Sequence, residues 1–491
     1  MWIDANDLDD DQVLRSDLCI VGAGAAGITL ARDLIGTPLQ VILLESGGLE
    51  LEEETQDLYE GTSSGLDGVK LRSDRLRQFG GSSQHWEGMC LPFQAEDFRR
   101  RDYVHNSGWP ISLDTLQSYY ERAHETLEVG RFVYDAATLA ETEGQQTLPL
   151  DSDRVISRAY RLSPPTHLGQ RSFFDNASNV DIYHHANLVE LRLSPSLDHV
   201  AALRCATLQG KRFEVQPRLV VLATGGLENA RLLLSSREQI PEGVANRSGN
   251  VGRYFMEHPH YYGGAYAVMP SGLSYAFYRT HTSTHEKQER IFGALALPAR
   301  VREREGLLAA TLSLQPSELK DAKVDSPIAA QKLPALLGSS SQDLKLARLT
   351  LRCEQSPYAE SRITLGSERD ALGLPRLDLR WQIHPDDKRS VRRTLELLGA
   401  ELGRAGLGRL WFPLTHGEYA HSQRGGAHHM GTTRMGADPK TSVVDEHGRC
   451  HDVDNLYLAG SSVFVTGSDA NPTLTLVALA HRLAEHLQSL P

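Results

Sequence analysis

Three glycines near the N-terminus have the spacing of a loop that binds a dinucleotide. Gly22, Gly24 and Gly27 form a G-x-G-x-x-G pattern between an apolar run at 17–21 and a helical pattern that begins near Ala25. Gly22 permits a tight turn, Gly24 lets a pyrophosphate approach the backbone, and Gly27 allows the helix to pack closely on the strand. The sequence therefore predicts an anion-binding helix N-terminus in this loop.

A carboxylate follows where such a loop requires one. A second apolar run, 41–44, leads directly to Glu45, which lies 18 residues after Gly27. A carboxylate in this place would accept hydrogen bonds from an adenosine ribose, and an acid rather than an arginine favours NAD or FAD over NADP. The structural alternative is that the glycines only form a tight turn.

Several other segments are expected to build the same nucleotide-binding architecture. The apolar runs at 17–21 and 41–44 with the helix between them form one βαβ unit. The run 218–223 leads into Thr224, Gly225 and a helical stretch, which predicts another strand, loop and helix. Near the C-terminus a buried strand is predicted at 456–460, and Asn471-Pro472 marks the start of a helix, because Asn is a favoured N-cap and Pro a favoured first helical residue.

The middle of the chain has a different pattern. Between 260 and 415 successive strand-like runs favour a mostly antiparallel sheet inserted into the nucleotide-binding part. The runs are 263–269, 291–297, 309–314, 347–353 and 377–383. The segment 320–345 is expected to be an excursion or lid, and 132–150 to be a second loop.

Composition narrows the class of protein. The 491 residues carry 51 Lys and Arg against 63 Asp and Glu, a net charge of −12, which argues against a general nucleic-acid or anionic-membrane binder. Five scattered cysteines without a C-x-x-C pair argue against a disulfide scaffold or a zinc site and favour a reducing compartment. With no export signal and no long apolar run, we expect a cytoplasmic protein without a membrane span.

Beyond these patterns, the chain resembles the glucose-methanol-choline (GMC) family of FAD-dependent oxidoreductases, and within it the pyranose-oxidase-like branch. The resemblance covers nearly the whole chain. It rests on the N-terminal glycines and on the segments 80–88, 223–229, 252–259, 428–436, 456–460 and 470–475. It implies FAD as cofactor, in an α/β Rossmann-like domain that carries a mostly antiparallel β-sheet substrate-binding domain.

The resemblance also implies a pair of catalytic residues. In the family, a His three residues before a Gly-Thr pair is the base, and this position is His428 here; its partner precedes the Pro of the last helix, and is Asn471. Oxidation of a carbinol needs loss of a hydride to flavin N5 and of the hydroxyl proton, and a neutral imidazole can take that proton while an amide holds the hydroxyl. The alternatives are that His428 is only a structural histidine and that Asn471 is only the N-cap of the helix.

The remaining implied contacts concern the cofactor. In some relatives the residue at His85 is bonded covalently to the flavin, but Gln84 replaces their Thr, so a covalent bond and a non-covalent His beside the isoalloxazine both stay open. The implied FAD-binding residues, besides Gly22, Gly24, Ala25, Gly27 and Glu45, are Gly81, Ser82, Ser83, His85, Trp86, Val189, Thr224, Gly225, Gly460, Ser461, Asn471 and Thr473. No metal is expected, because His258 and His260 have no acid or Cys cluster to complete a site.

Taken together, these observations predict oxidation of an alcohol, most specifically of a secondary hydroxyl of a pyranose or glycoside to a ketone. Alternatives are an amino-sugar or natural-product alcohol, an FAD-containing lyase, and a non-catalytic dinucleotide sensor. The electron acceptor, whether dioxygen, a quinone or a redox protein, stays open. The expected FAD-binding domain comprises 1–100, 150–255 and 425–491, the substrate-binding domain 256–424, and a connecting or lid segment 101–149.

Overall fold

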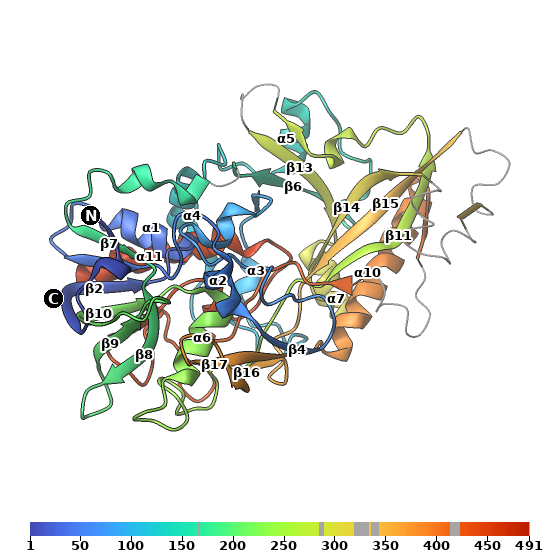
Figure 1. Ribbon diagram of the computed structural model, residues 1–491. Helices are drawn as coiled ribbons and strands as arrows, with labels where there is room; N and C mark the ends of the chain where they lie inside the picture. The colour runs from blue at the N-terminus through green and yellow to red at the C-terminus, as the bar shows by residue number, and fades with distance from the viewer. Residues whose placement is uncertain (165–166, 284–288, 319–332, 335–342, 413–422, 491) are drawn as a thin grey trace.

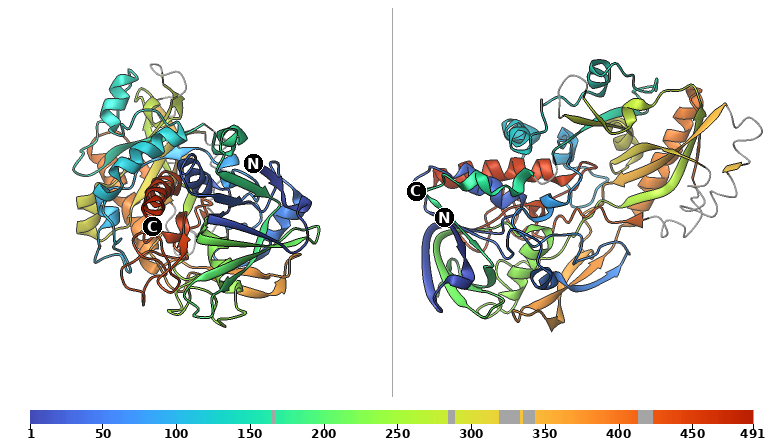
Figure 2. Two further views of the ribbon diagram at one scale, coloured as in Figure 1. Left: turned by 90° about the vertical axis from the view of Figure 1, so that its left-hand side faces the viewer. Right: turned by 45° about the horizontal axis from the view of Figure 1, so that its top comes forward.

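Two large sheets lie at opposite ends of the molecule. The computed structural model describes residues 1–164, 167–283, 289–318, 333–334, 343–412 and 423–490. Figure 1 shows the first sheet, with strands β2, β7 and β10, on the left and the second sheet, with β11, β14 and β15, on the right. Both chain termini lie at the end of the first sheet, as the right-hand view of Figure 2 also shows.

The first sheet has a parallel core. Its order is β1-β7-β3-β2-β10-β9-β8, with β20 also paired to β10. All pairs from β1 to β10, and the β20 pair, are parallel, whereas β9 and β8 join in antiparallel register. The strands are β1 (Trp2–Asp4), β2 (Gln12–Val21), β3 (Val41–Leu44), β7 (Val180–His184), β8 (Asn187–Leu193), β9 (Val200–Ala206), β10 (Arg212–Leu222) and β20 (Leu456–Leu458).

Helices cover this sheet and explain its continuous apolar runs. Every residue of β3 is buried, which is typical of a parallel strand covered on both faces. Helix α1 (Ala25–Asp33) packs with α11 (Pro472–Ser489) in one apolar cluster, through Ile28 and Leu483 among others. Helix α6 (Gly225–Ser235) follows β10. The predicted βαβ unit, the strand at 456–460 and the helix start at Asn471-Pro472 are confirmed.

The second sheet is antiparallel in all its described pairings. Its order is β18-β11-β15-β14-β13-β6-β5, with β12 on β13 and β19 on β11. Helix α10 (Pro385–Arg404) packs Leu395 and Leu398 into the same core as Leu349 of this sheet. The strands are β5 (Met89–Cys90), β6 (Ile156–Leu162), β11 (His260–Pro270), β12 (His281–Thr282), β13 (Arg290–Ala296), β14 (Ala310–Ser317), β15 (Leu344–Cys353), β18 (Arg409–Trp411) and β19 (Gln423–Arg424).

One predicted strand belongs elsewhere. The run 377–383 was expected in the antiparallel insertion, but β17 (Pro375–Trp381) lies in a separate three-stranded sheet with β16 (Arg362–Arg369) and β4 (Gly61–Gly65). It pairs with β4 in parallel, and this partner lies some 300 residues earlier in the chain, where no local pattern can reveal it. Strands β5 and β6 likewise join the second sheet from ranges assigned to the FAD-binding domain, whose boundaries stay a prediction.

The expected loop at 132–150 contains a helix, so that expectation was wrong. Asp135 caps α5 (Ala136–Thr142) by accepting a hydrogen bond from Thr138 N at 2.8 Å, and Leu139 is buried in the core of the second sheet. The expected lid at 320–345 lies largely outside the described residues. The other helices are α2 (Glu53–Gln56), α3 (Ala95–Phe98), α4 (Leu113–Leu127), α7 (Ala299–Glu305), and the 3-10 turns Ala5–Asp7, Asp57–Tyr59, Gly81–Gln84, His167–Gly169, Arg171–Phe174, Ala276–Tyr278 and Ser461–Val463.

Candidate active site

A cavity of about 490 Å³ begins where three neighbouring parallel strands end. Strands β2, β10 and β20 are adjacent in the sheet, and each is followed by a glycine that lines the cavity: Gly24, Gly225 and Gly460. A Cβ on any of the three would meet no atom within 4 Å, so the glycine backbone is directly accessible from the cavity. Helices α1 and α6 start at the first two glycines, and their N-terminal N–H groups favour a phosphate.

The other two glycines of the pattern serve close packing. Gly22 has φ +102°, and a Cβ on it would lie 2.8 Å from the Ala223 carbonyl oxygen of the neighbouring loop. A Cβ on Gly27 would lie 1.9 Å from the Gly22 carbonyl oxygen. Gly27 is therefore placed where the helix touches the strand, and it does not line the cavity.

Glu45 lines the cavity at the end of β3. Its two carboxylate oxygens accept hydrogen bonds from Ala23 N at 2.8 Å and Gly47 N at 3.0 Å. Burial raises the pKa of Glu45, against the effect of these two N–H donors. The carboxylate thus joins the glycine loop to the next strand end, and each oxygen keeps a second lone pair for another donor.

Most of the residues expected to bind the cofactor line this cavity. Val189 does not: the register of β8 against β9 shifts between Leu188 and Glu190, and Leu188 is the residue that reaches the cavity. The contact of Val189 stays a prediction. The expected residues that line the cavity are Gly22, Gly24, Ala25, Glu45, Gly81, Ser82, Ser83, His85, Trp86, Thr224, Gly225, Gly460, Ser461, Asn471 and Thr473, together with His428.

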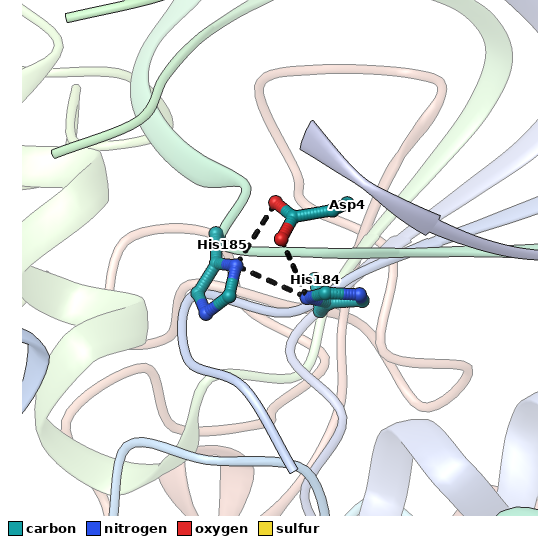
Figure 3. Close-up of side chains that lie close together, drawn as sticks. All are labelled: Asp4, His184 and His185. Atoms are coloured by element: carbon teal, nitrogen blue, oxygen red, sulfur yellow. Dashed lines mark hydrogen bonds and ion pairs between the residues drawn. The ribbon is translucent and has the colours of Figure 1, made fainter. Parts of the chain in front are cut away.

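A charged cluster supports one wall of the cavity. Figure 3 shows Asp4, at the end of β1, facing His184 and His185 at the end of β7. His185 Nδ1 lies 3.0 Å from Asp4 Oδ1, and its Nε2 lies 2.9 Å from Glu52 Oε1. Burial opposes protonation, but these two carboxylates outweigh it and raise the pKa of His185. The imidazole of His185 therefore links the segments of Asp4 and Glu52. The next residue, Ala186, lines the cavity.

At the other end of the cavity His428 faces Asn471. Asn471 occupies the N-cap position of α11, yet its side chain makes no capping hydrogen bond. Its Nδ2 lies 3.2 Å from His428 Nε2, while its Oδ1 is buried with no partner among the described residues. The structure therefore brings the two expected catalytic residues together and leaves the amide oxygen available inside the cavity.

A second histidine fixes which nitrogen of His428 carries the proton. His258 Nε2 lies 3.1 Å and 2.9 Å from the carbonyl oxygens of Gly467 and Ser468, so it must donate. A neutral His258 then accepts at Nδ1, which lies 2.8 Å from His428 Nδ1, and that atom must donate. His428 Nε2 consequently carries no proton, and its lone pair faces the Asn471 Nδ2 donor.

Burial, two neighbouring histidines and Arg352 favour the neutral form of His428. Burial lowers the pKa of His428 well below its usual range, and His258, His260 and Arg352 lower it further. Glu257 holds the loop before this histidine, since its carboxylate accepts from His428 N at 2.6 Å and Gly426 N at 2.8 Å. Burial raises the pKa of Glu257 to about 8.

Sequence reasoning missed His258 and Glu257 as functional residues. Both belong to the segment 252–259, which was recognised only for its place in the family pattern. Their contacts with the loop at 426–428 span about 170 residues, so no local spacing could reveal them. The one signal in the sequence that could have identified these residues was a Glu and a His directly before a Pro in a buried segment.

The site defines a dinucleotide-binding redox enzyme, and the residues present fit FAD. The bare glycine backbones would hold the pyrophosphate, Glu45 the ribose, and the unpartnered Trp86 Nε1 and Asn471 Oδ1 are buried polar atoms that border the same space. Comparison with known proteins agrees. A family profile described as GMC oxidoreductase, C-terminal region, matches residues 357–480.

Relatives extend the match over the whole length. The chain is 25% identical to the paromamine 6'-oxidase of Streptomyces fradiae, over 97% of this chain and 92% of that protein. A C-glycoside 3-oxidase of Microbacterium trichothecenolyticum is 32% identical over 28% of this chain and 26% of its own. The crystal structure of pyridoxine 4-oxidase from Mesorbium loti shares the fold, with a TM-score of 0.58 at 19% identity over 96% of this chain and 98% of that one. Residues 357–480 are thus a GMC oxidoreductase C-terminal region, and the chain is similar to sugar oxidases over nearly its whole length.

Within the described residues, every helix is too short or too polar to cross a bilayer.

Proposed function

We propose that this enzyme oxidises a secondary hydroxyl of a pyranose sugar or glycoside to a ketone. FAD, when bound, accepts the hydride that leaves the carbinol carbon. The similarity to a paromamine oxidase and to a C-glycoside oxidase supports a sugar or glycoside as substrate. The aromatic side chains of Trp86 and Tyr262 border the cavity, and Tyr262 is exposed, so an apolar sugar face would find aromatic surface there.

His428 is the proposed base. Its Nε2 is unprotonated and lies beside Asn471 in a residue that lines the cavity, so it takes the hydroxyl proton while the carbon loses the hydride. Asn471 Oδ1 or Nδ2 holds the same hydroxyl in line. His258 acts through His428 as a positioning residue, because its acceptor Nδ1 keeps the proton of His428 on the far nitrogen. This hydrogen-bond order is the single observation that carries the proposal.

The cofactor contacts follow the Rossmann-like arrangement that we propose for the first sheet. Gly24, Gly225 and Gly460 would surround the pyrophosphate at the carboxyl ends of β2, β10 and β20. The segment Gly81–Trp86 would approach the isoalloxazine, where covalent and non-covalent roles of His85 are both consistent with its place in the cavity. All five cysteines are buried and free, which supports a cytoplasmic location.

An amino-sugar alcohol is the second candidate, because paromamine names one relative's substrate. The test for both is anaerobic mixing of the holoenzyme with neutral sugars, glycosides and amino sugars while the visible flavin band is followed. We expect bleaching by one sugar class. Readmission of air then identifies an oxidase, since a dehydrogenase stays bleached until a quinone or redox protein is added. A flavin that no alcohol bleaches, in an enzyme that cleaves a cyanohydrin, would establish the lyase instead.

A further inference from the structure

An unpaired cation lies in the substrate end of the cavity. Arg352 lines the cavity together with His260, Tyr262 and His428, and only 9% of it is exposed. Its Nη1 is buried without a hydrogen-bond partner, and within the described parts of the chain its guanidinium forms no ion pair. A guanidinium stays charged at every physiological pH, and a buried charge is costly unless it is paired.

The second sheet places this cation beside His260 on the cavity that His428 also lines. His260 on β11 and Arg352 on β15 are directly opposite in the antiparallel register, so their side chains share one face of the sheet. His260 Nε2 is also buried and unpartnered, and it borders the same loop as His428. Both residues thus line the same cavity, and each has one buried nitrogen without a partner among the described residues.

The buried carboxylates near Arg352 form ion pairs or hydrogen bonds with other groups. Asp469 pairs with Arg158 at 2.7 Å and accepts from Thr311, while Glu354 pairs with Arg101. Glu257 accepts three backbone N–H groups. Glu87 borders the cavity but is exposed to solvent, and among the described residues it forms no ion pair with Arg352.

We propose that Arg352, with His260, binds an anionic group of the substrate, so that the preferred substrate is a pyranose or glycoside that carries a carboxylate. A carboxylate matches the planar fork of a guanidinium and would neutralise its charge. The proposal rests on the proposed function, whose substrate class it narrows, and it argues against an ammonium sugar at this position.

The first test measures binding without turnover. Tetrahydropyran-2-carboxylate has no hydroxyl to oxidise, and its neutral carboxamide has the same shape, so calorimetric titration of both into oxidised holoenzyme isolates the charge. We expect the carboxylate to bind about 10- to 100-fold more tightly. Arg352→Gln should remove this preference, and Arg352→Lys should keep part of it. Equal affinity of the two compounds for the wild type, or a preference that survives in Arg352→Gln, would overturn the proposal.

The matched control is Arg424→Gln. Arg424 on β19 pairs with the other side of His260 in the sheet, but it is exposed and does not border the cavity. The Arg424→Gln variant removes the same charge from the same sheet, so we expect this variant to keep the carboxylate preference. Loss of the preference in this variant as well would mean that net charge, and not Arg352, causes the preference. Bound FAD and the melting temperature establish that each variant is folded.

The second test separates this proposal from the proposed function. Methyl glucuronide, methyl glucoside and glucosamine differ in charge on one pyranose scaffold, and their rates of anaerobic flavin reduction are compared at pH 8, where His428 is neutral. We expect the glucuronide to react at the lowest concentration, and Arg352→Gln to lose that advantage. Reduction by the neutral glucoside without preference for the acid would reject the anion site and leave the function intact. Failure of every sugar would reject the function, while the titration still decides the role of Arg352.

Discussion

At the scale of single residues, the chemistry proposed for the site depends on a chain of hydrogen bonds. The chain runs from the carbonyl groups of Gly467 and Ser468 through His258 to His428. Each nitrogen has one assigned role, because backbone carbonyls can only accept and an amide nitrogen can only donate. With both histidines neutral, as their lowered pKa values favour, the proposed base His428 presents an unprotonated Nε2 beside Asn471. A histidine with a carboxylate partner would instead hold a proton at neutral pH.

Replacement of His428 by Ala tests the base directly. The rate of flavin reduction should fall by about 10²- to 10⁴-fold, the usual contribution of a general base, while FAD stays bound. Anaerobic stopped-flow measurement of the flavin band gives this rate, and the absorbance ratio of flavin to protein gives the cofactor content. An unchanged rate in a folded, FAD-loaded variant would refute the assignment.

The pH dependence of the wild-type rate tests the protonation state. His428 must be neutral to accept a proton, and its pKa is lowered by burial, by the neighbouring histidines and by Arg352. The rate should consequently be flat from alkaline pH down through 6.5, the usual His value, and fall only at more acidic pH. A fall centred at or above pH 6.5 would show that a different group, or a protonated His428, controls the reaction.

At the scale of elements, the cofactor site is formed by strand ends. Strands β2, β10 and β20 are each followed by a glycine at the same edge of the sheet, and β3 adds Glu45 beside them. Parallel neighbours bring their carboxyl ends together, so segments from the two ends and the middle of the chain line one cavity.

Glu45→Ala should weaken retention of FAD and also destabilise the glycine loop. The change removes the acceptor of two buried N–H groups, of Ala23 and Gly47, and each orphaned donor costs about 1–3 kcal/mol. Gel filtration followed by the flavin-to-protein ratio measures retention. Glu45→Gln keeps one acceptor and is the control; a Glu45→Ala variant with full cofactor after gel filtration would exclude the ribose role.

The buried ion network under the cavity predicts a large effect on folding. Glu228 on α6 pairs with Arg75 at 3.1 Å, Arg77 at 3.2 Å and Arg231 at 3.2 Å. Burial opposes its ionisation, yet the three guanidinium groups lower the pKa of Glu228 to about 2.

Glu228→Gln leaves buried Arg75 and Arg77 without an anion, while Arg231 keeps Asp370 at 2.6 Å, so the free energy of unfolding should fall by about 3–5 kcal/mol. Urea denaturation measures it. Glu396→Gln, which breaks an exposed pair on α10, should have a much smaller effect. Comparable losses in the two variants would contradict the network's role.

Local patterns explain which elements could be predicted from the sequence. The βαβ unit and the α11 start carry their own signals in glycines, apolar runs and caps, and they were predicted correctly. The place of β17 beside β4, the joining of β5 and β6 to the second sheet, and the contact of His258 with His428 depend on pairings across long sequence distances. Helix α5 was missed because its segment is short and weakly periodic.

At the scale of the whole molecule, the cavity is lined by residues from both large sheets, and each sheet supplies a different set. The first sheet supplies the glycine loops and Glu45, and the second supplies His260, Tyr262 and Arg352 from β11 and β15. The base and its amide partner come from the C-terminal segments that connect them. On the proposed assignment, different elements would set cofactor binding and substrate choice, which is consistent with the variety of substrates named among the relatives.

The most direct measurement of the central claim is anaerobic mixing of the purified holoenzyme with a panel of neutral, acidic and amino sugars, their glycosides and simple alcohols. We expect a pyranose or glycoside to bleach the visible flavin band, and the same compound to fail to do so in the His428→Ala variant within the same time. A flavin that stays oxidised with every sugar, or one that the variant reduces at the wild-type rate, would contradict this claim.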